Sequence, residues 1–157
     1  MYEYLDRPVA QLDRGPQLLV WAMRRCARGG PASPCAMREI GTAFHAHRLG
    51  CALPHFQLAM TVLDASMREE LALGTDAVSE HEALLLALIG TLPRCSADLA
   101  SDIAGRIVHL EAAPHLADAL RQLALRLFAR DLLCAAPEDR AGGRPQGRGG
   151  ANDMGNT

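Results

Sequence analysis

The chain contains no lysine, so all sixteen of its basic residues are arginine. Without lysine it cannot form a Schiff base, and it lacks the phosphate-binding lysine of a P-loop, so both classes of function are excluded. The arginines are scattered from Arg7 to Arg148, whereas a functional demand for guanidinium groups would cluster them. We therefore attribute their number to a composition biased toward alanine, arginine, glycine and proline.

Aromatic residues and long apolar runs are also scarce. Aromatics make up 4% of the chain, which is too few for a platform on which nucleic-acid bases stack. No segment reaches the roughly 18 uninterrupted apolar residues of a membrane span. The first apolar run, LLVWAM at 18–23, is short and follows Glu3, Asp6 and Asp13, unlike a secretory signal, which begins with basic residues. We therefore expect no membrane span, and the composition disfavours nucleic acid as a partner.

The rest of the composition is that of an ordinary globular protein. Of the 157 residues, 49% are apolar and 22% charged, and the formal net charge of −2 gives no general attraction to DNA or anionic lipid. A chain of this length forms one domain with its own hydrophobic core. The cysteine count is odd and no secretory signal is recognisable, so we expect a cytoplasmic protein with reduced thiols.

Proline and glycine divide the chain into amphipathic segments, and the alternation typical of strands does not occur. These segments predict six helices, over 16–28, 35–49, 54–73, 79–92, 97–113 and 114–134. We expect an all-α fold, with a single compact bundle of five or six helices over 16–134 and an extended segment at 1–15. The tail at 135–157 has too few apolar side chains to offset the entropy of ordering, so we expect it to be disordered.

A Glu-His-Glu triplet at 80–82 directly precedes the most apolar run of the chain. A metal or acid-base site built on His81 would need a polar partner three or four positions later, but positions 84 and 85 are both leucine. Ser79 followed three residues later by Glu82 instead fits a capping box, and acidic residues are favourable at the start of a helix. The triplet therefore predicts a helix start and no local catalytic site.

Cysteine and histidine are numerous enough to raise the hypothesis of a metal site. The five cysteines are Cys26, Cys35, Cys51, Cys95 and Cys134, and none belongs to a C-x-x-C pair. If the helices run alternately up and down, the loops after the second and fourth helices share one end of the bundle. Cys51 and Cys95 would then meet His47 and His55, a set that suits zinc. A thiol or zinc sensor is therefore one alternative function.

A DNA-binding regulator is a second alternative. Ala46, Gly50 and Phe56 have the spacing of a helix-turn-helix motif. The segment that would enter the groove, ALPHFQLAMT at 52–61, contains no arginine, which leaves too little for phosphate or guanine contacts.

No catalytic grouping is recognisable in the sequence, and what remains is surface for another protein. We see no nucleophile at a strand-to-helix elbow, and the one pair kept for an enzyme is His115 with Asp118. The LLVWAM segment is apolar nearly all round its helix, so it is either central in the bundle or covered by a partner. Trp21 with Arg24, Arg25 and Arg28 provides the residue types that dominate interface hot spots. We therefore predict a non-enzymatic interaction or regulatory module, binding another protein or itself as a homodimer and requiring no cofactor.

Three stretches share a common order and spacing with one family. LLVWAMRRCARGG, PHFQLAMTVL and VSEHEALLLAL together resemble an uncharacterised family of small all-helical bacterial proteins that carry a domain of unknown function. The resemblance covers about residues 16–90 and implies a helical fold and a bacterial cytoplasm. Members of that family carry adjacent cysteines just before the capped helix, where this chain has GTDAV at 74–78, so the resemblance supplies no metal site.

Overall fold

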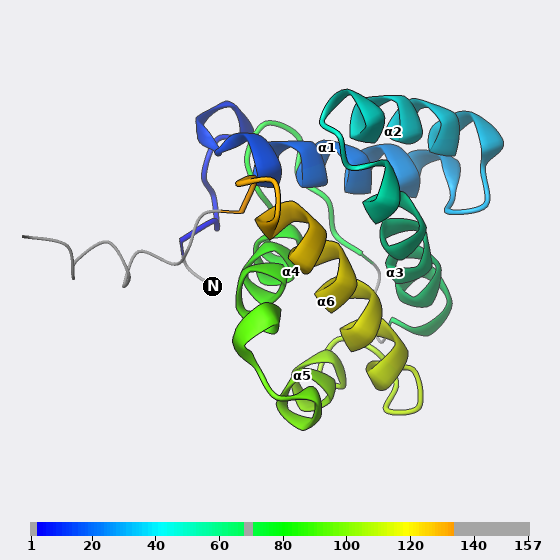
Figure 1. Cartoon of the computed structure of the whole chain (residues 1–157), viewed down its shortest axis with the longest axis vertical. Coiled ribbons are helices and arrows are strands. Elements are labelled where there is room, and N and C mark those ends of the chain that lie inside the picture. The colour runs from blue at the N-terminus through cyan, green and yellow to red at the C-terminus, as the bar shows by residue number, and fades with distance from the viewer. Residues whose placement is uncertain (1–2, 68–70, 134–157) are drawn as a thin grey trace, which may run out of the picture.

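The computed structural model describes residues 3–67 and 71–133, and the fold is a set of six α-helices joined by short connections (Figure 1). The helices are α1 (Arg14–Gly29), α2 (Pro34–Ala46), α3 (Leu53–Ser66), α4 (Glu80–Thr91), α5 (Ala97–Ala104) and α6 (Ala113–Phe128). Three short 3-10 helices lie between them, namely η1 (Val9–Gln11), η2 (Gly50–Ala52) and η3 (Leu92–Arg94). Only isolated β-bridges form in the two described ranges, so the predicted all-α fold is confirmed.

The helix starts follow the local signals in the sequence. Ser33 and Ser96 each accept a hydrogen bond from a backbone amide in the first turn of α2 and α5. At the start of α4 the predicted capping box is present, with the Ser79 hydroxyl accepting from the Glu82 amide at 3.3 Å and the Glu82 carboxylate accepting from the Ser79 amide at 2.9 Å. The Glu-His-Glu triplet therefore does begin a helix.

Four helices end at least three residues earlier than their hydrophobic patterns predict. Helix α2 ends at Ala46 rather than at residue 49, and α6 ends at Phe128 rather than at residue 134. The third was predicted to reach residue 73, but α3 ends at Ser66 because Met67 adopts an extended conformation and forms a bridge with Val108. The fifth was predicted to reach residue 113, but α5 ends at Ala104, and the His109 amide donates to the Ser66 carbonyl at 3.0 Å. The predictions for α3 and α5 fail for the same reason, since each chain segment finds its partner in the other.

Helix α6 lies at the centre of the fold and packs against α3, α4 and α5 (Figure 1). Its buried face alternates alanine and leucine, which lets neighbouring helices approach closely while still filling the space between them. The buried residues of α6 are Ala113, Leu116, Ala117, Ala119, Leu120, Leu123, Ala124 and Leu127. Helix α1 packs across the top of this group against α2 and α4. None of the helices in the described ranges is long and apolar enough to cross a membrane.

The segment before α1 lies along the connection between α3 and α4. The Val78 amide donates to the Arg7 carbonyl at 2.9 Å, and the Val9 amide donates to the Asp76 carbonyl at 2.9 Å. The expected extended segment therefore contains a short 3-10 helix, and α1 begins at Arg14 rather than at residue 16. Gly15 lies against the carbonyl of Leu132, near the end of the described chain. The tail at 135–157, for which we predicted disorder, and Cys134 lie outside the described residues.

Candidate functional site

Trp21 lies on the outer side of α1, at the middle of the helix. Its side chain is 40% exposed, while most of the apolar residues around it in the sequence, such as Leu19 and Ala22, are buried in the core. The helix therefore has a buried side that packs inward and an outer side that carries Trp21. The LLVWAM segment is therefore mostly buried in the bundle, and Trp21 is its one exposed residue.

Two surface hollows lie on either side of Trp21. The larger, of about 530 Å³, is lined on α1 by Arg14, Gln17 and Leu18 and on α2 by Ala43, with His47 beside it. The smaller, of about 220 Å³, is lined by Val20 and by three arginines, Arg24, Arg25 and Arg28. Val9 lines both hollows together with Trp21, so the indole stands as a ridge between them. We refer to the exposed α1 residues that line the two hollows as the Trp21 face; they are Arg14, Gln17, Trp21 and Arg28.

The three predicted arginines have three different environments. Arg24 forms a buried ion pair with Glu82 of α4, with Nε 2.7 Å from Oε1 and Nη2 2.9 Å from Oε2. Arg25 pairs with Glu39 of α2, with Nη2 2.8 Å from Oε1, at the exposed surface. Arg28 forms no ion pair with any described residue. Of the three, Arg28 alone has its guanidinium available to a partner.

The Arg24–Glu82 pair joins α1, α4 and the connection that precedes α4. Arg24 also donates to the carbonyls of Thr75 and Ala77, and Glu82 accepts from the amides of Gly74 and Ser79. The Glu82 side chain is 0% exposed and that of Arg24 only 12%. Burial alone would raise the pKa of Glu82, but the hydrogen bonds from Arg24 and the two amides outweigh it, so this pKa lies below its ordinary value. The pair therefore holds α1 against α4 and the connection that precedes α4.

The sequence did not predict this ion pair, although it did identify a structural position for one of the two residues. The capping box identified Glu82 as a residue of the first helical turn, which would ordinarily leave its carboxylate facing solvent. Its partner is 58 positions earlier in the chain, and no local spacing connects Arg24 with Glu82. His81 has a similarly local role, because its Nδ1 accepts a hydrogen bond from the Ala72 amide at 2.9 Å.

Of the four residues considered for zinc, three lie between the end of α2 and the first turn of α3, namely His47, Cys51 and His55, and the fourth, Cys95, lies elsewhere. His47 follows α2 and Cys51 lies in η2, whereas Cys95 follows η3 and its carbonyl accepts a hydrogen bond from Arg121. In Figure 1 the connection after α2 is at the top of the molecule and the connection after α4 is near the bottom, so the up-and-down order that would bring these loops together is not present. No group of three or more histidine, cysteine or acidic side chains is placed to hold a metal ion among residues 3–67 and 71–133, a range that includes His55.

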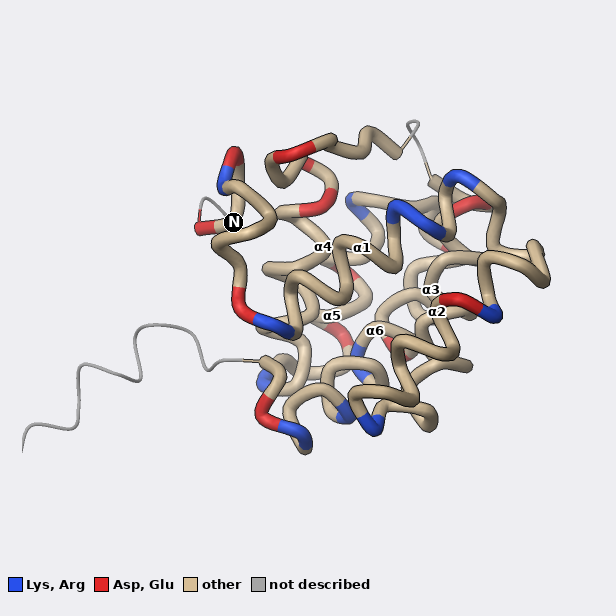
Figure 2. The backbone as a smooth tube through the Cα atoms, turned by 90° about the horizontal axis from the view of Figure 1, so that it is seen from above, with Lys and Arg blue, Asp and Glu red and all other residues tan. Residues whose placement is uncertain are grey.

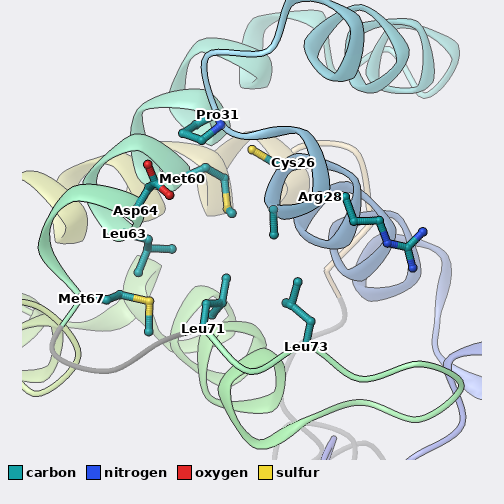
Figure 3. Close-up of a pocket in the computed structure, with 10 residues that line it drawn as sticks. Cys26, Arg28, Pro31, Met60, Leu63, Asp64, Met67, Leu71 and Leu73 are labelled. Atoms are coloured by element: carbon teal, nitrogen blue, oxygen red, sulfur yellow. The ribbon is translucent and has the colours of Figure 1, made fainter.

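A third hollow, of about 550 Å³, lies between α1, α3 and the residues that follow α3 (Figure 3). Most of its lining residues are apolar or contain sulfur, with Met60 and Met67 contributed by α3 and its end, and Cys26 by α1, but polar atoms form at least as much of its exposed surface as apolar atoms do. Asp64 lies at its edge, and the guanidinium of Arg28 points away from it (Figure 3). Burial raises the pKa of the Cys26 thiol to about 11, with a smaller contribution from the Asp64 carboxylate, so this thiol stays protonated at neutral pH. No described histidine lines this hollow, and the predicted pair His115 and Asp118 is exposed on α6.

The comparisons with known proteins add no relative. The chain matches no protein-family model, no curated protein and no solved structure. The resemblance to a family of small helical bacterial proteins therefore remains a prediction.

Proposed function

We propose that this chain is a non-enzymatic protein-protein interaction module that binds its partner on the Trp21 face. The observation that carries the proposal is a tryptophan, 40% exposed, that lines two hollows on the outer side of α1. Tryptophan and arginine are the residues most enriched at the energetic centres of interfaces, and hollows beside such an anchor receive side chains of the partner. The free thiols of Cys26, Cys35, Cys51 and Cys95 support a reducing compartment such as the cytoplasm.

Rigidity of α1 supports the same proposal. On its inner side the helix is held by buried Leu19, Met23 and Cys26, and at its C-terminal half it is held by the ion pairs of Arg24 and Arg25. A partner that binds a surface already fixed in place has less conformational entropy to remove on binding. Arg24 and Arg25, which we predicted to touch the partner, line the smaller hollow and also fix α1 through their ion pairs.

The proposal is tested by comparing Trp21→Ala with Phe128→Ala. Phe128, at the end of α6, is also a large exposed aromatic residue, at 54%, but it lies outside the Trp21 face, so the two variants remove similar exposed surface. We expect Trp21→Ala to lose roughly thirtyfold or more in affinity for the protein that co-purifies with the natural chain, since hot-spot truncations cost about 2 kcal/mol or more. Phe128→Ala should bind normally, and both variants should keep the helical circular dichroism of the natural chain. Equal binding by the two variants would remove the Trp21 face as the site.

The hollow beside Cys26 supports a second candidate function, the binding of a small apolar molecule. Its volume of about 550 Å³ falls within the range of ligand pockets. Methionine and leucine line it, and methionine adapts to ligands of irregular shape. Ala27→Trp places a large side chain at its wall, and we expect this variant to abolish saturable binding of the apolar fluorophore Nile red. Trp21→Ala is the matched control and should leave that binding unchanged. Absence of saturable binding to the natural chain would end this candidate.

A further inference from the structure

The Trp21 face has a regular arrangement of charge. Arg14, Trp21 and Arg28 follow one another at intervals of seven residues, which is close to two helical turns, so the three side chains lie along one side of α1. All three are exposed, and each arginine is displaced from Trp21 by about 10.5 Å along the helix axis. An apolar anchor therefore stands midway between two cations.

This surface has no acidic counterpart of its own. The residues that line the two hollows include Arg14, Arg24, Arg25 and Arg28 but no aspartate or glutamate among those that the structure describes. The carboxylates of Glu82 and Glu39 compensate Arg24 and Arg25, and neither Arg14 nor Arg28 has an ion-pair partner in the described ranges. Figure 2 shows the basic residues in blue along α1. The uncompensated charge at both ends of the face is positive.

We infer that the partner of the Trp21 face is an acidic amphipathic helix of a different protein. This inference rests on the proposed function and adds the chemistry of the partner to it. The partner helix lies along α1 with an apolar side chain against Trp21, and its carboxylates, about two turns to either side, face Arg14 and Arg28. A helix repeats its side chains at the same interval as α1, so the side chains of the two helices can interdigitate along their length.

The same charges argue against a second copy of this chain as the occupant. A two-fold axis through Trp21 would bring Arg14 of one protomer to Arg28 of the second copy when the helices run antiparallel. Parallel helices would bring like-numbered arginines together. Both arrangements place cations opposite cations, which disfavours the contact. The homodimer that the sequence left open is therefore not expected on this face.

Site-specific photo-crosslinking of the full chain tests the inference. Gln17, which is exposed and lines the larger hollow, is replaced by p-benzoylphenylalanine, the chain is irradiated in extract of its own cells, and the crosslinked peptide is sequenced. We expect a peptide from a different protein in which acidic residues flank an apolar one at helical spacing. A peptide from this chain itself, or one that is neutral or basic, would overturn the inference.

Charge reversal in the same crosslinking assay separates the inference from the proposed function. Arg14→Glu with Arg28→Glu should lower the adduct yield roughly tenfold, whereas Arg38→Glu with Arg106→Glu, which changes the net charge equally at other exposed positions, should not. If Trp21→Ala abolishes the adduct but reversal at Arg14 and Arg28 has no effect, docking stands and the acidic partner is refuted. If the chain that carries the crosslinker at position 17 and no other change forms no light-dependent adduct, the proposed function and this inference both fail.

Discussion

Replacement of Arg24 by methionine should destabilise the protein by about 3 kcal/mol at pH 7, and the reasoning can be followed from the structure. Methionine retains most of the apolar length of the arginine side chain, so the change removes the guanidinium with little loss of packing. It leaves the Glu82 carboxylate, which is 0% exposed, with the amides of Ser79 and Gly74 as its hydrogen-bond donors. Breaking a buried ion pair from one side typically costs about 3–5 kcal/mol.

The protonation of Glu82 limits the size of this effect. A buried carboxylate without its cation can take up a proton, and protonating a carboxyl group of ordinary pKa about 4.3 at pH 7 costs about 3.7 kcal/mol. The penalty should therefore not exceed about 4 kcal/mol, and the two remaining amide donors bring it nearer to 3. The same argument predicts that the penalty becomes smaller as the pH falls toward 4, because protonation of Glu82 then costs little.

Urea unfolding followed by circular dichroism measures the effect, for the natural chain and for two variants. Arg24→Met should lower the midpoint in proportion to about 3 kcal/mol, which corresponds to roughly 6–12 °C in a thermal scan. The double variant Arg24→Met with Glu82→Gln should recover about half of the loss, since no buried charge is left without a partner. A loss below about 1 kcal/mol for the single variant, or no recovery in the double variant, would refute the stabilising role of the Arg24–Glu82 ion pair.

Three further predictions follow from groups elsewhere in the fold. The folded-state pKa of Glu82 is lower than its ordinary value, so its contribution to stability is present above about pH 4.5 and is lost as the pH falls through the folded pKa. Glu82→Gln should therefore make the free energy of unfolding less dependent on pH on the acid side. An unchanged dependence would contradict the lowered pKa. Cys26, with a pKa of about 11 and no exposed surface, should react with a thiol reagent at pH 8 only as fast as the protein unfolds. Exposed Cys35 should react at once. Equal rates for the two thiols would show that Cys26 is accessible in the folded protein. Gly15→Ala should destabilise the protein by about 2 kcal/mol or more, because the added methyl group would overlap the backbone carbonyl of Leu132. Gly90→Ala, in open space within α4, should stabilise it by about 0.5 kcal/mol. Calorimetry that ranks the two variants in the opposite order would exclude the close approach of Gly15 to Leu132.

The features predicted correctly from sequence depend on residues three or four positions apart. The start of α4 was predicted because Ser79 and Glu82 lie in the same helical turn, and the all-α class was predicted because apolar residues recur at helical spacing. The ends of α3 and α5 were not predicted, since they are set by the pairing of Met67 with Val108, 41 positions later in the numbering. Side-chain partners across such separations also decided the candidate site, because hydrogen bonding to Glu82 took Arg24 away from the surface.

For Trp21, too, the sequence indicated the residue type but not the exposure of the side chain. Its residue type and its arginine neighbours could be recognised in the sequence, but its exposure depends on which side of α1 faces α2 and α4. The run LLVWAM is apolar nearly all round, so its pattern alone does not determine that side.

The central position of α6 has a consequence for how the protein is made. This helix provides the contact surface for α3, α4 and α5, yet it is the last of the described helices to leave the ribosome. Until residues 113–128 have been synthesised, the sides of α3, α4 and α5 that pack on α6 remain uncovered in the nascent chain. Chaperone contact should therefore peak shortly before α6 emerges and end soon after it does, because one late helix closes the whole core.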